Sequence, residues 1–502
     1  MKFKSQKSLK NRIYRSDWHL TRPMGIISPS DIYYLQLSNK IQKIIELTSN
    51  NEIFTPTISI KISVSIAAYF EDVISGFGLW KALTVIHEKM YGKYLPFYQI
   101  YDDEYCDDEI NCEDVLFLIW CYLQRDDIDN DKSRFLNPEN PFLTILADEI
   151  YDLLNSEFET APANESVYKY LHTIDCTKDF LSLRELLGWL HYDSYLALSY
   201  PRQNMLKQFE IFEDENIDEF FNKNEDLLKY YLEKSLIFSS KCSPLAIYAK
   251  DWLTEMYRDT HKEELVKSIQ FKQIDNYHIV DNDKDTIKII NADNEEFVVS
   301  IDSISEPPSF KEMNIIMCSI VFFKGLWHVN GLASFASDKR KLEREEDKNK
   351  IRENNQQTYE FVIKKTENAI QYFKDADGLS SFLLKLFPNT EKDKILPENY
   401  LKHTDIVTFV DPEIGLTFYP DIAVFIKDKN NPCYDIKDVE TQGLGMLTGY
   451  FGISVQLMKF LIKNNLLSDI SLKSLLGKEY GNRQIQENIE FIVRFFQPAL
   501  YP

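Results

Sequence analysis

The sequence predicts an α+β protein that is mainly α-helical, with a large helical N-terminal region, an inserted small β-barrel of SH3-like or OB-like type, and a C-terminal α+β segment. Two observations predict this class. Apolar residues recur at helical spacing through residues 16–265, and the pattern changes to an alternation of period two from residue 268. Hydrophobic residues make up 44% of the 502 residues, which is typical of a globular chain with a sizeable core.

The helical region, residues 16–265, follows a basic arm at residues 1–15. In "SPSDIYYLQLSNKIQKIIEL" the isoleucines and leucines follow a helical period, and Ser30 or Asp31 is placed to cap the helix. We expect the next helix to run over 57–91 and to end at Gly92. The same reasoning predicts six more helices, at 113–123, 141–158, 178–199, 204–221, 224–238 and 244–262.

The barrel is predicted over residues 268–335. Inward-facing apolar residues alternate with polar ones in three runs, which contain Tyr277 and Ile279, then Ile287 and Ile289, then Phe297, Val299 and Ile301. The polar turns "DNDKD" and "NADNEE" separate these runs. The apolar runs "IIMCSIVFF" and "LWHVNGLASF" follow, joined by Lys324 and Gly325. Five short strands in so few residues are typical of a small barrel.

A charged helix and linker are predicted over residues 336–400, and an α+β segment over 401–502. "SDKRKLEREEDKNKIRENNQQ" is either a helix or a tether, and a helix over 358–374 follows it. "DIVTFV" and "GLTFYP" are expected strands, whereas "DIAVFI" fits a strand or a helix. "SVQLMKFLIKNNLL" and "NRQIQENIEFIVRFF" are expected to close the chain as helices.

The helix at 57–91 contains adjacent carboxylates, Glu71 and Asp72, and two glycines. In one continuous helix each glycine costs about 1 kcal/mol relative to alanine, so we expect a close helix crossing that offsets this cost. Asp72 and His87 then lie about 22 Å apart along the axis, too far to share one metal ion. We therefore interpret Glu71, Asp72 and His87 as a structural polar cluster, with an arginine from another helix beside Glu71, and predict no metal site.

In the barrel, Trp327 and His328 are neighbours on one strand, so their side chains lie on opposite faces. Surface aromatics on small barrels often bind peptides or nucleic acids, so Trp327, His328 and Tyr277 are the candidate ligand-binding residues. The alternative is that Trp327 belongs to the core and His328 is merely exposed.

Catalytic motifs such as G-x-S-x-G, the P-loop, G-x-G-x-x-G and H-E-x-x-H are absent from the sequence. The glycine-rich run "GLGMLTG" at 443–449 follows charged residues, so it favours a loop or a helix start over a phosphate site. We expect no cofactor. One enzymatic alternative stays open, a metal-dependent hydrolase or nuclease whose site is assembled from distant carboxylates and histidines.

The net charge is −22, which disfavours nucleic acid and anionic membranes as partners over most of the surface. Residues 102–131 hold twelve acids and one arginine, but the cluster lacks the glycine and ligand pattern of a calcium loop, and whether it binds divalent ions stays open. Residues 1–15 carry six lysines or arginines and no acid, so nucleic acid is expected only through this arm. An RNA-associated or ribosome-associated factor is the second alternative.

The seven cysteines are scattered singly, and neither a secretory leader nor a long apolar run is evident. These features favour a reduced cytoplasmic location without a membrane. Together with the missing motifs and the barrel, they favour a non-catalytic binding or scaffold protein with protein partners.

Several long stretches resemble a family of Bacteroidetes proteins catalogued only as a domain of unknown function. They include "YFEDVISGFGLW", "DEINCEDVLFLIWCYLQ" and "DPEIGLTFYPDIAVFIKDKNNPCYD", and together they extend over essentially the whole chain. The resemblance implies no activity and no catalytic residue.

Overall fold

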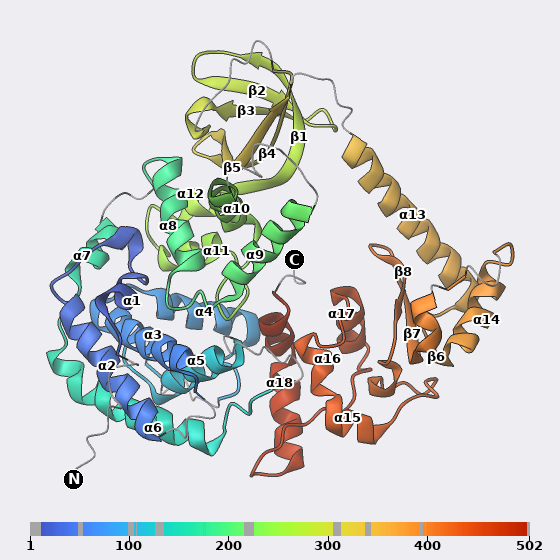
Figure 1. Ribbon diagram of the computed structural model, residues 1–502, viewed down its shortest axis with the longest axis horizontal. Coiled ribbons are helices and arrows are strands. Elements are labelled where there is room, and N and C mark those ends of the chain that lie inside the picture. Colours follow the sequence, from blue (N-terminus) through green and yellow to red (C-terminus); the bar gives the residue numbers. More distant parts are fainter. Residues whose placement is uncertain are drawn as a thin grey trace, which may run out of the picture. The chain divides into compact units, whose positions relative to one another are not determined.

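The chain folds as an α+β protein, mainly α-helical, with a closed five-stranded barrel in the middle (Figure 1). It divides into two compact units, of which one comprises residues 1–130 and 138–340 and the other comprises 131–137 and 341–502. This computed structural model describes residues 12–48, 54–98, 105–106, 108–125, 135–173, 175, 177–214, 225–304, 313–336, 343–390, 395–396 and 398–498. Most of the basic arm and much of the acidic stretch 102–131 therefore lie outside the described residues.

Helices build most of the first unit. The bounds are α1 Arg15–His19, α2 Asp31–Thr48, α3 Pro56–Ser75, α4 Leu79–Tyr91, α5 Cys112–Arg125, α6 Pro141–Glu157, α7 Glu165–Tyr168, α8 Phe180–Tyr192, α9 Tyr200–Asp214, α10 Glu225–Ser239, α11 Ala249–Met256 and α12 Glu263–Lys267. Short 3₁₀ turns lie at η1 Pro23–Gly25 and η2 Phe158–Thr160, and a π turn lies at η3 Lys169–Thr173.

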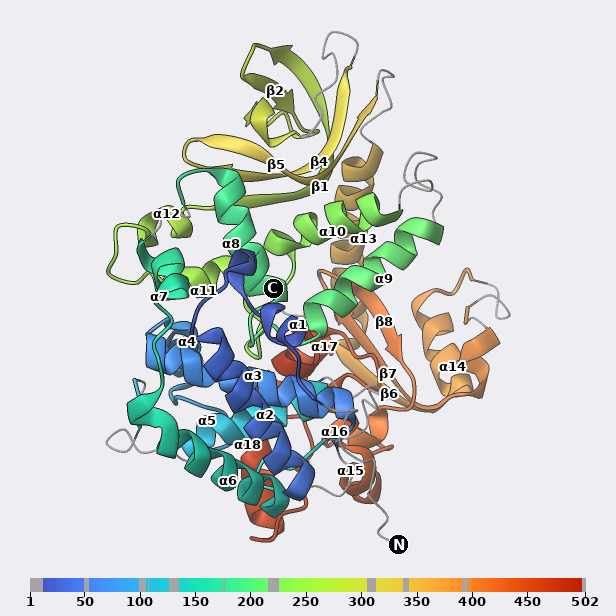
Figure 2. The same ribbon diagram turned by 60° about the vertical axis from the view of Figure 1, so that its left-hand side comes forward.

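The helices of the first unit pack in a contiguous group, in which α2 contacts α3 and α6, and α5 contacts α3 and α6 (Figures 1 and 2). Large aromatic side chains fill the core between them, and burying such rings is a major source of stability. The indole rings that are buried completely or almost completely are those of Trp18, Trp80, Trp120 and Trp252.

The prediction of one helix over 57–91 is wrong, because α3 ends at Ser75 and α4 begins at Leu79 after a bend of 93°. Gly76 and Gly78 have φ angles of 65° and 84°, in the left-handed region that favours glycine. A Cβ atom would meet nothing closer than 4.0 Å at Gly76 and nothing within 4 Å at Gly78. These glycines therefore turn the chain between two helices and do not mark a close helix crossing.

The barrel consists of β1 Gln270–Asn282, β2 Thr286–Ile290, β3 Glu296–Ser300, β4 Ile315–Phe323 and β5 Leu326–Ala336, with the 3₁₀ turn η5 Ile301–Ser303 after β3. The strands close in the order β1-β2-β3-β5-β4. All neighbours pair antiparallel except β3 and β5, which pair parallel at Val299↔Trp327 and Ser300↔His328. This order with one parallel pair is that of an OB-fold, which decides between the two predicted barrel types.

The barrel is docked on the helices of its own unit through β5. Asn330 and Gly331 lie against α10, where the Nδ2 of Asn330 donates to the carbonyl oxygen of Ser235 at 3.2 Å. A Cβ atom at Gly331 would lie 2.5 Å from the carbonyl oxygen of Tyr231, so only glycine permits this approach. In Figure 1, β2 and β3 lie on the side of the barrel away from α10, and Figure 2 shows the same for β2.

The second unit is built on a three-stranded antiparallel sheet of order β6-β7-β8. Its elements are α13 Glu343–Thr366, β6 Ile370–Asp375, α14 Ala376–Leu386, η7 Glu398–Lys402, β7 Thr404–Asp411, β8 Gly415–Tyr419, η8 Ala423–Phe425, α15 Ile436–Gln442, α16 Leu444–Thr448, α17 Val455–Lys463 and α18 Lys478–Phe496. Helices α13 and α14 cover the face that carries Val410, whereas α17 covers the face that carries Phe409.

Three local expectations are resolved in this unit. The predicted helix over 358–374 is wrong beyond Thr366, because Glu367 has a left-handed φ of 60° and β6 begins at Ile370. The glycine-rich run at 443–449 contains the helix α16, and "DIAVFI" contains the 3₁₀ turn η8. The charged stretch is helical from Glu343, where the described part of it begins.

In the described part of the chain, no single helix has the length and apolar character needed to cross a membrane. The bent pair α3 and α4 meets that criterion only when its two helices are taken together.

Candidate functional site

The carboxylate of Asp72 lies at the bend between α3 and α4 and caps the second helix. It accepts hydrogen bonds from the backbone N–H groups of Gly78, Leu79 and Trp80, at 2.8, 3.3 and 2.8 Å. The hydroxyl of Tyr195 donates a fourth bond at 2.7 Å. Because the unpaired N–H groups of a helix N-terminus stabilise a negative charge, this side chain replaces the usual capping residue of α4.

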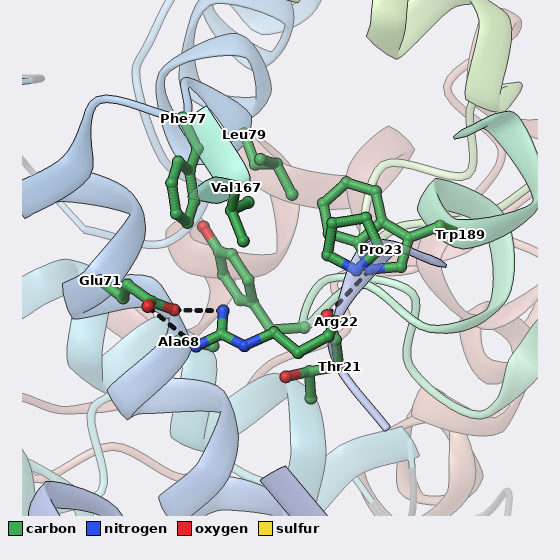
Figure 3. Close-up of a pocket in the computed structure, with 10 residues that line it drawn as sticks. Thr21, Arg22, Pro23, Ala68, Glu71, Phe77, Leu79, Val167 and Trp189 are labelled. Atoms are coloured by element: carbon green, nitrogen blue, oxygen red, sulfur yellow. Dashed lines mark hydrogen bonds and ion pairs between the residues drawn. The ribbon is translucent and has the colours of Figure 1, made fainter. Parts of the chain in front are cut away.

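The carboxylate of Glu71, only 1% exposed, points toward the guanidinium of Arg22 (Figure 3) and belongs to a separate ionic cluster. The guanidinium of Arg22 binds it through two nitrogen atoms, at 2.5 and 2.8 Å. The same guanidinium binds Asp31 at 2.7 Å, and the Nδ2 of Asn164 donates to Glu71 at 2.9 Å. The predicted arginine partner of Glu71 therefore exists, but it comes from the turn before η1 and not from another helix.

This cluster contains one buried guanidinium between two buried carboxylates, so its formal charge is −1 when both acids are ionised. Burial raises the pKa of Glu71, and the nearby guanidinium of Arg22 opposes that rise. The ring of Trp18 lies 4.4 Å from the guanidinium carbon and adds a cation–π contact. The arrangement ties the N-terminal segment to α3.

A small cavity lies between this cluster and the bend, lined by Arg22, Phe77, Leu79, Trp189 and Tyr195 among others (Figure 3). Its volume is about 20 Å³, which is the space of about one water molecule. The cavity is thus too small for a substrate. Glu71 lines this cavity, whereas Asp72 does not.

A further buried carboxylate, Asp114 in the first turn of α5, was not singled out by sequence reasoning. The hydroxyls of Tyr69 and Tyr105 donate to it at 2.6 and 3.1 Å, and Asn111 donates at 3.1 Å. Burial raises its pKa to about 7, and raises the pKa of Asp72 to about 6. The only sequence signal was an acid in the first turn of a strongly apolar helix.

His87 lies in α4 and is buried. Its Nδ1 atom lies 2.6 Å from the carbonyl oxygen of Lys93, and its ring packs 4.8 Å from that of Tyr91. Burial lowers its pKa to about 4, so the imidazole is neutral at pH 7. Its environment is that of a packed aromatic side chain near the end of a helix.

The structure separates the three barrel residues. Tyr277 is 2% exposed and lies in the barrel core, 5.7 Å from the ring of Phe297. Trp327 is half-buried against the same core and contacts Phe297 at 5.1 Å. His328 faces out of the barrel, but its ring stacks on Phe180 of α8 at 4.6 Å. The strand that carries Trp327 and His328 is therefore used for contact within the protein.

The outer face of β2 and β3, with the part of β1 that carries Val280, is exposed, although α10 also contacts β1. Val280 and Val298 are 50% and 43% exposed there, beside an ion pair between Lys288 and Glu296 at 2.7 Å. Residues 281–296 carry six acids and two lysines, a net charge of −4. Of the aromatic rings in β1 to β3, those of Tyr277 and Phe297 point into the barrel core. Those of Phe271 and His278 are partly buried.

The histidine and acids of the C-terminal segment form separate surface pairs. His403 lies 2.9 Å from Asp421, and Asp428 accepts from the hydroxyl of Tyr372 at 2.9 Å. Over the described ranges of the chain, no three His, Cys, Asp or Glu side chains are grouped so that they could hold a metal ion.

The fold and these surfaces define a mainly helical protein that carries a docked OB-like barrel with one uncovered face. The profile of the family described as "protein of unknown function (DUF3843)" matches residues 12–296 and 326–497, so the chain belongs to this family. No curated protein and no solved structure matches the chain significantly.

Proposed function

We propose that this protein is a non-catalytic binding protein of the cytoplasm whose barrel binds a basic surface of a protein partner. The outer face of β1, β2 and β3 carries the proposal, because β5 occupies the opposite side of the barrel with α8 and α10. The six described cysteines are free, which supports a reduced compartment.

The chemistry of this face favours protein over nucleic acid. OB-folds that bind single strands stack bases on exposed aromatic rings in a positively charged groove. Here the exposed apolar residues are valines, and the surrounding turns are acidic. A small apolar centre with a charged rim is typical of protein interfaces, and the acidic rim complements a basic partner.

Affinity capture with the full chain tests the proposal. The double variant Val280→Lys/Val298→Lys places two cations on the face, whereas Leu206→Lys changes a similarly exposed apolar residue of α9 as a matched control. We expect partners with basic surfaces to bind the wild type and the control, and to be lost from the double variant. Equal capture by all three proteins, or capture of no partner, would contradict the proposal.

Fluorescence anisotropy with a single-stranded oligonucleotide separates the RNA-associated alternative. We expect the barrel face not to bind the oligonucleotide. Any binding that is measured should therefore be the same in the wild type and in the Val280→Lys/Val298→Lys variant. Salt-sensitive binding that disappears when residues 1–11 are deleted would assign nucleic acid to the basic arm and not to the barrel.

A further inference from the structure

The second unit contains a groove at the turn between β7 and β8. One wall is a polar face of α13 with Arg352, Glu353, Gln357 and Glu360, and the opposite wall is formed by Glu413 in the turn and Gln456 in α17. Its volume is about 880 Å³, within the range of about 300–1,000 Å³ that is usual for ligand sites. The groove is open and combines charged and amide side chains with the apolar residues Pro412 and Ile414, so it fits a ligand that has both polar and apolar groups.

The groove lies where an edge strand begins. β8 pairs with β7 on one side, and within the described residues no backbone group pairs with its other side. The two helices that line the groove cover opposite faces of the sheet, since α13 packs on Val410 and α17 packs on Phe409. The groove therefore lies beside the turn that leads into β8, lined by Pro412, Glu413 and Ile414, and no residue of β8 itself lines it. An unpaired edge can accept an extended peptide as an added strand.

The side chains of the groove indicate the charge of such a peptide. Three carboxylates, of Glu353, Glu360 and Glu413, face one guanidinium, that of Arg352, which gives a net charge of −2. The carboxylate of Glu413 is held in place by the Nε2 of Gln456 at 2.9 Å. Glutamine amides can both donate to and accept from a peptide backbone. An anionic ligand is disfavoured, and the residues that line the groove include no aromatic ring for a sugar or a base.

We propose that an extended basic segment of a partner protein adds to the free edge of β8 and places a lysine or arginine in the groove beside Glu353 and Glu413. The backbone bonds of the added strand supply affinity, and the carboxylates select a cationic side chain. This site is separate from the barrel face and does not depend on it.

Fluorescence anisotropy with the full chain and labelled decapeptides tests the site. The probe alternates lysine with valine or threonine, a second peptide has glutamate in place of lysine, and a third has prolines that cannot form ladder bonds. We expect saturable binding of the first peptide and at least about tenfold weaker binding of the other two, since ladder bonds and charge both contribute. No saturable binding of the first peptide, or equal binding of all three, would overturn the proposal.

Variants locate the binding and separate it from other surfaces. Glu353→Lys/Glu413→Lys should weaken the first peptide by at least about tenfold, whereas Glu490→Lys, an exposed residue of α18 outside the groove, should not. The variant Val280→Lys/Val298→Lys on the barrel should bind the peptide as the wild type does. The peptide assay therefore tests the groove alone, and a negative result would not bear on the function proposed for the barrel face. If only a peptide with the sequence of residues 1–15 bound, the ligand of the groove would be the chain's own basic arm. The proposal of a partner segment would then be wrong.

Discussion

The guanidinium of Arg22 binds the carboxylate of Glu71 through two nitrogen atoms, in a cluster where both side chains are at least 97% buried. These residues are 49 positions apart in the sequence, so this pair fixes the N-terminal segment onto α3. Breaking a buried ion pair on one side leaves an uncompensated charge, which is why such pairs are sensitive to substitution.

Arg22→Met is therefore expected to lower the free energy of unfolding of the first unit by about 3–5 kcal/mol, because Glu71 and Asp31 lose their cation. Urea denaturation followed by tryptophan fluorescence measures this. Arg258→Gln, which removes an exposed arginine paired with Glu255, is the control and should cost about 1 kcal/mol or less. Equal stability of Arg22→Met and the wild type would show that the cluster does not anchor the segment.

The effect of substitutions at Gly78 on stability is expected to depend on how well the new residue tolerates a positive φ, and not on the size of its side chain. Its φ of 84° costs an alanine about 1–2 kcal/mol, while asparagine tolerates this region better and valine tolerates it worse. Thermal unfolding should thus rank glycine, asparagine, alanine and valine from most to least stable. If alanine proved as stable as glycine and only large residues destabilised the protein, packing would be the constraint instead.

His191 predicts a pH dependence. Burial lowers its pKa to about 3, with a smaller contribution from Arg202, whereas the unfolded chain has a value near 6.5. Because the unfolded state binds more protons between these values, stability is lost as the pH falls below about 6.5, by about 1.4 kcal/mol per pH unit for this one group.

Burial raises the pKa values of Asp72 and Asp114, so these acids make the protein more stable as the pH falls, which is opposite to the effect of His191. The pH dependence of the wild type alone therefore does not give the contribution of His191. The stability difference between the wild type and His191→Gln removes their contribution. Between pH 7 and pH 5 we expect the wild type to lose about 2 kcal/mol relative to the variant. A difference that stays constant with pH would mean that His191 has the same pKa in the folded protein as in the unfolded chain.

Gly331→Ala is expected to loosen the contact between β5 and α10, because the new Cβ would clash with Ser235 and with the carbonyl oxygen of Tyr231. Hydrogen exchange measured by mass spectrometry should show faster exchange in both elements. Gly325→Ala is the matched control, since it also has a positive φ but nothing within 4 Å of an added Cβ. Similar exchange in β5 and α10 of the two variants would contradict this docking.

The barrel strands were predictable because inward residues such as Ile287 and Ile289 alternate with polar ones, and this local pattern survives in the fold. The parallel pairing of β3 with β5 was not predictable, because no local sequence pattern encodes which strands pair. The bend at Gly76 and Gly78 was missed since an apolar run on both sides mimics one helix. Its signal was present in Asp72, six residues before Gly78, which caps α4 from the preceding helix.

The polar partners in the helical core were beyond sequence reasoning for a different reason. Asn164 and Arg22 meet Glu71 only after three distant segments have folded together. The strand β6 was read as helix because the helical pattern of α13 precedes it without a proline or glycine. Only the left-handed backbone at Glu367 separates the two.

The stacking of His328 on Phe180 and the fit of Gly331 against α10 also determine how the chain can be divided for biochemistry. A fragment cut near residue 268 would carry the strands without α8 and α10, and would expose aromatic and amide groups that the full chain covers. Such a fragment would tend to self-associate through its bare β5 side. Expression boundaries that retain both helices preserve the barrel in its native surroundings.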